Sequence, residues 1–154
     1  MKKREDLIGA VLIAPPDDYK VFKKTLGSRY DDVIKKVRSV IESNMENKPS
    51  TEFLHCKSAR RLLSISDPQN FEARAFSVKY GLKEFSQIKK DLLILIEGSD
   101  EYEKNPKEFR RKLKEANQNA DVEIIKGAGH SFIGYEKTAA RVISKWLKRK
   151  DLLS

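Results

Sequence analysis

The segment GAGHSF, residues 127–132, contains the residue best suited to acid–base chemistry in this chain. His130 lies among glycines just after an apolar run, as expected for a loop at the end of a strand. Because an imidazole exchanges protons near neutral pH, His130 is a candidate general base. A second loop, EGSDEYEKNP, offers the carboxylates of Asp100 and Glu101. A carboxylate bonded to His130 would fix the tautomer of the ring and stabilise its charged form during acyl transfer.

Other side chains with reactive atoms have simpler interpretations. We expect Ser131 to be a loop residue and Ser99 to be a turn residue. His55 and Cys56 are neighbours, but adjacent side chains on a helix or a strand point apart, so Cys56 is expected to be a packed thiol. With one cysteine and two histidines far apart in the sequence, we expect neither a metal nor a cofactor.

Three further polar residues lie close to the predicted strand ends. Asp17 and Asp18 follow the first apolar run and could contact a ligand, but a turn or a helix cap explains them adequately. Tyr102 follows the candidate acids, where it either lines the same cleft or packs. None of the three is needed for the chemistry considered above.

Three apolar runs predict the strands that must position these loops, at residues 7–14, 91–98 and 122–126. Their nearly continuous apolar character is typical of strands covered on both faces. Helical patterns at 105–118 and 136–150 alternate with them, which predicts a parallel sheet with right-handed crossovers. Ligands gather at the carboxyl ends of strands in such sheets, so the histidine and the acid are expected to converge.

A long stretch between the first two strands is predicted to be helical and irregular. Residues 31–45 place apolar side chains on one helical stripe, and shorter helices are predicted at 58–65 and 70–80. The segment SDPQN, residues 66–70, is a turn signal between those two. Farther along the chain, Asn105 is predicted to cap the helix at 105–118, with a proline at its first position.

The composition indicates a folded chain with a very polar surface. The 154 residues are 39% hydrophobic and 36% charged, with a net charge of +9. Lysines and arginines alternate with acids along the predicted helices, so we interpret the excess charge as solvated surface and do not expect nucleic-acid binding. No apolar stretch approaches the roughly 18 residues of a membrane span. With one cysteine and no export signal, we expect a cytoplasmic protein that does not enter a membrane.

From DLLILIEGSDEY through VEIIKGAGHSF to a final helix ending in WLKR, the chain resembles the C-terminal part of the α/β-hydrolase superfamily. The resemblance implies that His130 is the general base and Asp100 the acid that orients it, with Glu101 as the alternative acid. LIGAVLIAPP resembles the strand after the nucleophile-bearing helix, and residues 19–88 stand where such enzymes insert a helical cap. The expected fold is therefore one partial domain over residues 1–154, with a three-stranded parallel sheet, flanking helices and a cap-like insertion.

The nucleophile of such an enzyme is not found in the sequence. A nucleophile elbow requires G-x-S-x-G or a close variant, and none of the seven glycines has a serine, cysteine or aspartate two positions before it. The resemblance therefore implies hydrolysis of small carboxylic esters or similar bonds only if another chain, or a missing N-terminal half, supplies the nucleophile. We expect the isolated chain to be inactive.

The same resemblance predicts an open sheet edge. The strand that normally neighbours residues 7–14 is missing, which would leave a long apolar edge of a kind that natural proteins avoid. A second polypeptide, pairing of two copies as a homo-oligomer, an incomplete gene product, or coverage by the helical stretch would each resolve this. The alternative function is a non-catalytic interaction or oligomerisation module derived from a hydrolase. A weaker option is nucleic-acid binding driven by the charge of +9.

Overall fold

A computed structural model describes residues 7–43, 58–99 and 104–152 of the chain. Its contacts divide the chain into two compact units. The sheet unit comprises Met1–Pro16 and Phe85–Ser154, and the helical unit comprises Asp17–Glu84. The helical unit is inserted between the first and second strands of the sheet unit, and each unit has its own core.

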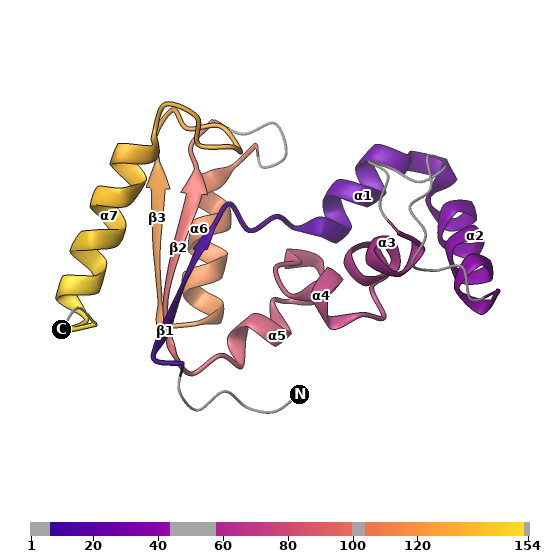
Figure 1. Cartoon of the computed structure of the whole chain (residues 1–154), viewed down its shortest axis with the longest axis horizontal. Coiled ribbons are helices and arrows are strands. Elements are labelled where there is room, and N and C mark those ends of the chain that lie inside the picture. Colours follow the sequence, from indigo (N-terminus) through magenta and orange to yellow (C-terminus); the bar gives the residue numbers. More distant parts are fainter. Residues whose placement is uncertain (1–6, 44–57, 100–103, 153–154) are drawn as a thin grey trace. The chain divides into compact units, whose positions relative to one another are not determined.

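The sheet unit contains three parallel strands, drawn as arrows in Figure 1. They are β1 (Gly9–Ile13), β2 (Asp91–Glu97) and β3 (Ala120–Ile125), in the order β1-β2-β3. Gly9 pairs with Asp91 across β1 and β2, and Leu92 pairs with Ala120 across β2 and β3. All residues of β2 after Asp91 are buried, as expected for a central strand covered on both faces. The predicted parallel sheet is thus confirmed.

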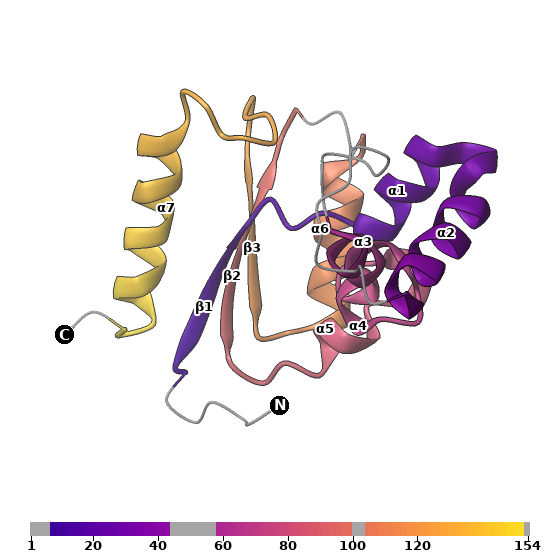
Figure 2. The same ribbon diagram turned by 45° about the vertical axis from the view of Figure 1, so that its right-hand side comes forward.

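One helix covers each face of this sheet, as Figure 2 shows. Helix α6 (Pro106–Ala116) buries Phe109 and Leu113. Helix α7 (Glu136–Arg149) buries Ala139 and Trp146, on a core that includes Leu93 and Leu95 of β2. The predicted cap of α6 is confirmed, because Asn105 Oδ1 accepts a hydrogen bond from the backbone N–H of Glu108 at 3.2 Å.

Strand β1 lies at an edge of the sheet, as predicted. Three large apolar side chains at its two ends are exposed: Leu7 by 46%, Ile8 by 64% and Ile13 by 52%. The N–H of Ala14 donates to Leu95 O at 2.9 Å, so the N–H and C=O of Ile13, one residue earlier, point away from β2. Within the described residues, no strand pairs with this outer side of β1.

The helical unit packs around a core of tyrosine, phenylalanine and aliphatic side chains. Its helices are α1 (Asp18–Leu26), α2 (Tyr30–Glu42), α3 (Ala59–Ser66) and α4 (Phe71–Arg74), with 3₁₀ turns at Gly27–Arg29 and Val78–Tyr80, and α5 (Lys83–Ser86) at the boundary of the two units. The predictions for α2 and α3 are confirmed to within a few residues.

A single helix at 70–80 was a wrong prediction, because the chain leaves the helix after Arg74. The N–H of Val78 donates to Asp17 Oδ2 at 3.2 Å instead of continuing a helical ladder. The other oxygen of Asp17 accepts from the N–H of Lys20 at 3.0 Å and caps α1. Asp17 is therefore the helix cap that the sequence allowed. Its burial raises the pKa of the carboxyl, against the lowering effect of these backbone hydrogen bonds.

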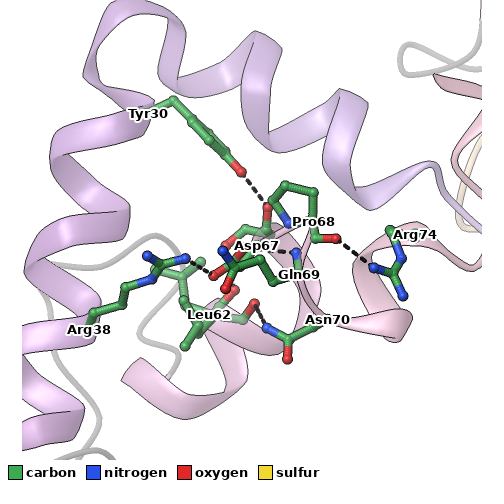
Figure 3. A network of polar contacts seen from close by, with 10 residues as sticks. Tyr30, Arg38, Leu62, Asp67, Pro68, Gln69, Asn70 and Arg74 are labelled. Atoms are coloured by element: carbon green, nitrogen blue, oxygen red, sulfur yellow. Dashed lines mark hydrogen bonds and ion pairs between the residues drawn. The ribbon is translucent and has the colours of Figure 1, made fainter. Parts of the chain in front are cut away.

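The end of α3 is held by the polar network drawn in Figure 3. Asp67 is 3% exposed, and its Oδ2 lies 2.6 Å from Nη2 of Arg38 on α2. Its Oδ1 accepts from the N–H of Gln69 at 2.9 Å, and its carbonyl accepts from the N–H of Asn70 at 2.9 Å. The predicted turn at SDPQN is confirmed.

Candidate functional site

Two titratable side chains meet at the carboxyl ends of β2 and β3. Glu97 is the last residue of β2, and His130 lies in the loop that follows β3. His130 Nδ1 lies 3.0 Å from Glu97 Oε1. Glu97 is only 5% exposed, whereas the side chain of His130 is 40% exposed. By strand alternation Glu97 shares the face of Leu93 and Leu95, which is the face covered by α7.

The ends of the two strands are brought close by Gly98. Its N–H donates to Ile125 O at 3.0 Å, and the N–H of Ser99 donates to Ala128 O at 3.0 Å. A Cβ at position 98 would lie 2.8 Å from both Ile125 O and Lys126 Cα. Only glycine permits this approach without a backbone shift. The register that brings Glu97 to His130 therefore depends on Gly98.

The loop that carries His130 is anchored on both sides. Ala128 is fully buried before the histidine, and Phe132 is 5% exposed after it. Both belong to the core beneath α7. The N–H of Phe132 donates to Gly129 O at 3.0 Å, and the N–H of Tyr135 donates to Phe132 O at 2.9 Å. His130 thus lies in a turn that is held on both sides by buried side chains.

Gly127 allows this turn to leave β3. Its φ of +82° lies in the region that favours glycine. A Cβ there would also collide with the hydroxyl of Tyr135. The positive φ favours glycine two residues after β3, and an added Cβ would also displace the Tyr135 ring.

With Glu97 ionised, the arrangement selects one tautomer of the imidazole. An ionised carboxylate only accepts hydrogen bonds, so Nδ1 of His130 then carries the hydrogen that points at Glu97. A nearly buried carboxylate needs such a partner. If the ring takes up a second proton at Nε2, the hydrogen bond becomes an ion pair. Glu97 thereby stabilises the charged state that a general base forms when it accepts a proton.

Among the described residues, the other sequence candidates of these loops, Ser99 and Ser131, do not join this pair. Ser99 forms the backbone bond described above, in keeping with a turn residue, and Ser131 is an exposed loop residue. Five candidates lie outside the described residues: His55, Cys56, Asp100, Glu101 and Tyr102. The expected contact of Asp100 or Glu101 with His130 therefore stays a prediction.

Glu97 was missed by the sequence reasoning, which sought the acid in the loop after β2. A signal was present, because Glu97 is the one charged residue in the otherwise apolar run 92–97. A charge at the end of a strand that is covered on both faces must be paired. His130 was the histidine expected at the same end of the sheet.

Among residues 7–43, 58–99 and 104–152, no group of three or more His, Cys, Asp or Glu side chains is placed to hold a metal ion. No helix in these ranges combines the length and the apolar character needed to cross a membrane.

The sequence matches no family model, and neither a curated protein nor a solved structure is detectably similar to it.

Proposed function

We propose that the sheet unit carries the histidine and the positioning carboxylate of a hydrolase of the Ser-His-Asp type, acting on small carboxylic esters or similar bonds. The 3.0 Å contact between His130 Nδ1 and Glu97 Oε1 is the observation that carries the proposal. It holds the ring as a triad histidine is held, with Nε2 as the nitrogen that exchanges the proton. The resemblance of the strand ends to α/β-hydrolases supports the same chemistry.

The identity of the positioning carboxylate is part of the proposal. Glu97 holds His130 through Nδ1, which is the role that the resemblance assigns to Asp100 or Glu101. A residue so deeply buried has few orientations available, and little water reaches its carboxylate. We assign Glu97 the positioning role, with Asp100 and Glu101 as rivals to be tested beside it.

The nucleophile must come from elsewhere under this proposal. No G-x-S-x-G elbow is present in the sequence, and the outer side of β1 offers a place for a further parallel strand. A strand that pairs there and ends in an elbow would add a hydroxyl at the same end of the sheet as His130. The strand could belong to another polypeptide or to a segment outside this sequence.

The direct test is turnover of p-nitrophenyl acetate by the full chain. The chain is assayed alone and then mixed with a polypeptide that contains a nucleophile elbow and is encoded by a neighbouring gene. We expect negligible turnover alone and turnover in the mixture. His130→Ala should abolish the activity of the mixture, and Glu97→Gln should lower kcat by about 10- to 100-fold with little change in KM. Asp100→Asn and Glu101→Gln serve as matched controls that should retain most of kcat.

Two results would defeat the proposal. One is robust turnover by the chain alone that His130→Ala leaves unchanged. The other is a mixture that assembles but has no activity. If Asp100→Asn loses more kcat than Glu97→Gln, the hydrolase proposal stands and Asp100 takes the positioning role.

A second candidate function is a non-catalytic interaction module that acts through the edge of β1. The exposure of Ile8 and Ile13, together with backbone groups that point away from β2, favours it. Light scattering of the purified chain, compared with an Ile8→Lys/Ile13→Lys variant, tests this function. A stable homodimer that becomes monomeric in the variant favours the module, whereas a complex formed only with an elbow-bearing partner favours the hydrolase.

A further inference from the structure

The outer surface of α7 carries a row of cationic side chains. Lys137, Arg141, Lys145 and Lys148 are all exposed. At 100° per residue they fall within an arc of about 80°, and they extend over about 16 Å of the helix. We call these four residues the α7 stripe.

No acid interrupts the α7 stripe. The only acidic residue of the helix is Glu136 in its first turn, which accepts a hydrogen bond from the N–H of Gly134 at 3.1 Å. The fifth cation of the helix, Arg149, lies 3.1 Å from Asp121 and is not part of the stripe. Across the described ranges 7–43, 58–99 and 104–152, no ion pair joins a stripe residue to a carboxylate.

Helix α6, on the other face of the sheet, provides the contrast. It also has five cations, but Glu108 and Glu115 lie among them. Arg111 is 2.7 Å from Glu108 and 2.6 Å from Glu115, and Lys112 is 3.5 Å from Glu108. The shallow hollow on α6 is lined by both signs, since Glu115 contributes to it. The solvated-surface interpretation fits α6 and does not describe α7.

We propose that the α7 stripe binds the phosphate backbone of a nucleic acid without reading its sequence. A line of cations along one helix matches a linear polyanion, and its binding would release the counterions condensed on the phosphates. Arginine and lysine can also bond base edges, but stacking on bases and amide contacts to adenine need aromatic or amide side chains, and the outer surface of α7 has none. The one tryptophan of the chain is turned inward instead, with its Nε1 donating to Asp121 at 2.9 Å.

A membrane surface fits the α7 stripe less well. Helices that lie on lipid place a large apolar face beside the basic one. The apolar side chains of α7 are used by the sheet, where Ala139 and Trp146 are buried and Val142 packs against the same core. The residues between the stripe positions include Thr138, Ala140 and Ser144, which offer nothing to insert into lipid.

The experiment is fluorescence anisotropy of a labelled 20-nucleotide oligouridine with the full chain at two salt concentrations. Four phosphate contacts predict a slope of log affinity against log salt of about −2.8, which is about a 50-fold loss between 50 and 200 mM salt. Changing all four stripe residues to Gln should weaken binding at low salt by at least about 10-fold and flatten this slope.

The matched control changes Lys107, Arg110, Lys112 and Lys114 of α6 to Gln. This control removes the same number of positive charges and should change the affinity for oligouridine by less than about 3-fold. Equal losses in both variants would mean that net charge alone drives binding, and would overturn the proposal. Circular dichroism checks folding, and if the fourfold α7 variant is unfolded, Arg141→Gln/Lys145→Gln replaces it.

Two further probes decide between classes of partner. Polyglutamate that binds as tightly as the oligouridine would show a surface for acidic protein instead, and would overturn the proposal. Binding to vesicles of phosphatidylcholine with 30% phosphatidylserine, in preference to the oligouridine, would overturn it in favour of a membrane. Absence of oligouridine binding at 50 mM salt would end it outright.

Discussion

Asp67 in the helical unit and Glu97 in the sheet unit are two buried carboxylates of similar construction. Asp67 is 3% exposed and bonds an Arg38 side chain that is 43% exposed. Glu97 is 5% exposed and bonds a His130 side chain that is 40% exposed. Each pair thus joins a deeply buried acid to a half-exposed base.

The partners make the two pairs different. Arg38 is permanently charged, and the carboxylate of Asp67 also accepts a hydrogen bond from the N–H of Gln69. This carboxylate therefore stabilises a turn. An imidazole can both donate and accept a proton in acid–base chemistry, so the same burial around Glu97 holds a group that can serve as a base. Burial of a carboxylate alone therefore says little about function, and the chemistry of the partner decides it.

Removing the acid of the structural pair should have the largest effect on stability. Asp67→Ala leaves Arg38 and the N–H of Gln69 without their acceptor, and we expect a loss of about 3 kcal/mol in the free energy of unfolding. Urea denaturation followed by circular dichroism measures it. Arg38→Ala should cost a similar amount, because it leaves the buried carboxylate of Asp67 without its counter-charge. An Asp67→Ala variant as stable as the wild type would show that the pair of Asp67 with Arg38 does not stabilise the fold.

The turn that carries His130 should be the next most sensitive. Gly127→Ala combines a positive φ with a collision against Tyr135, and we expect a loss of about 2–3 kcal/mol. Gly134→Ala is the matched control, since its φ of +81° is similar but an added Cβ would meet nothing within 4 Å. Its loss should be only about 1 kcal/mol. Equal losses, measured by urea denaturation, would show that the collision is relieved at no cost.

The sequence predicted the parallel sheet because its strands are long apolar runs that alternate with amphipathic helices. The cap at Asn105 and the turn at SDPQN were predictable because they depend on local hydrogen bonds. The break after Arg74 was not, because it depends on Asp17, which is 61 positions away from Val78 in the sequence. The pairing of Glu97 with His130 was missed for a similar reason. The two residues are 33 positions apart, and only the register of β2 and β3 joins them.

A smaller effect is expected from neutralising the buried acid of the candidate site. Glu97→Gln keeps an oxygen that can accept from His130 Nδ1, so the loss of stability should be about 1 kcal/mol. Asp67→Asn should cost about 2 kcal/mol, because a bond to a charged guanidinium is weakened. The proton on His130 Nδ1 should shift upfield in the NMR spectrum of Glu97→Gln as the bond loses its charge. An unchanged Nδ1 proton would mean that another group orients the ring.

Asp121 offers the smallest and finest test, because it lies in the sheet unit like Glu97 but has permanent cations as partners, like Asp67. Burial opposes its ionisation, but the hydrogen bond from Trp146 and the charges of Arg149 and Lys150 outweigh that effect. The pKa of Asp121 is therefore lowered from its ordinary value of 3.8.

A lowered pKa in the folded state gives stability that is present above pH 3.8 and is lost as the pH falls through the folded value. Asp121→Asn should therefore be less stable than the wild type at pH 5, by under about 1 kcal/mol, and the gap should narrow below pH 3.8. Urea denaturation at pH 5 and pH 3 measures both values. A gap that stays constant across this range would mean that the lost contribution is packing rather than charge. The contribution of Asp121 to stability would then differ in kind from that of the charge pair between Asp67 and Arg38.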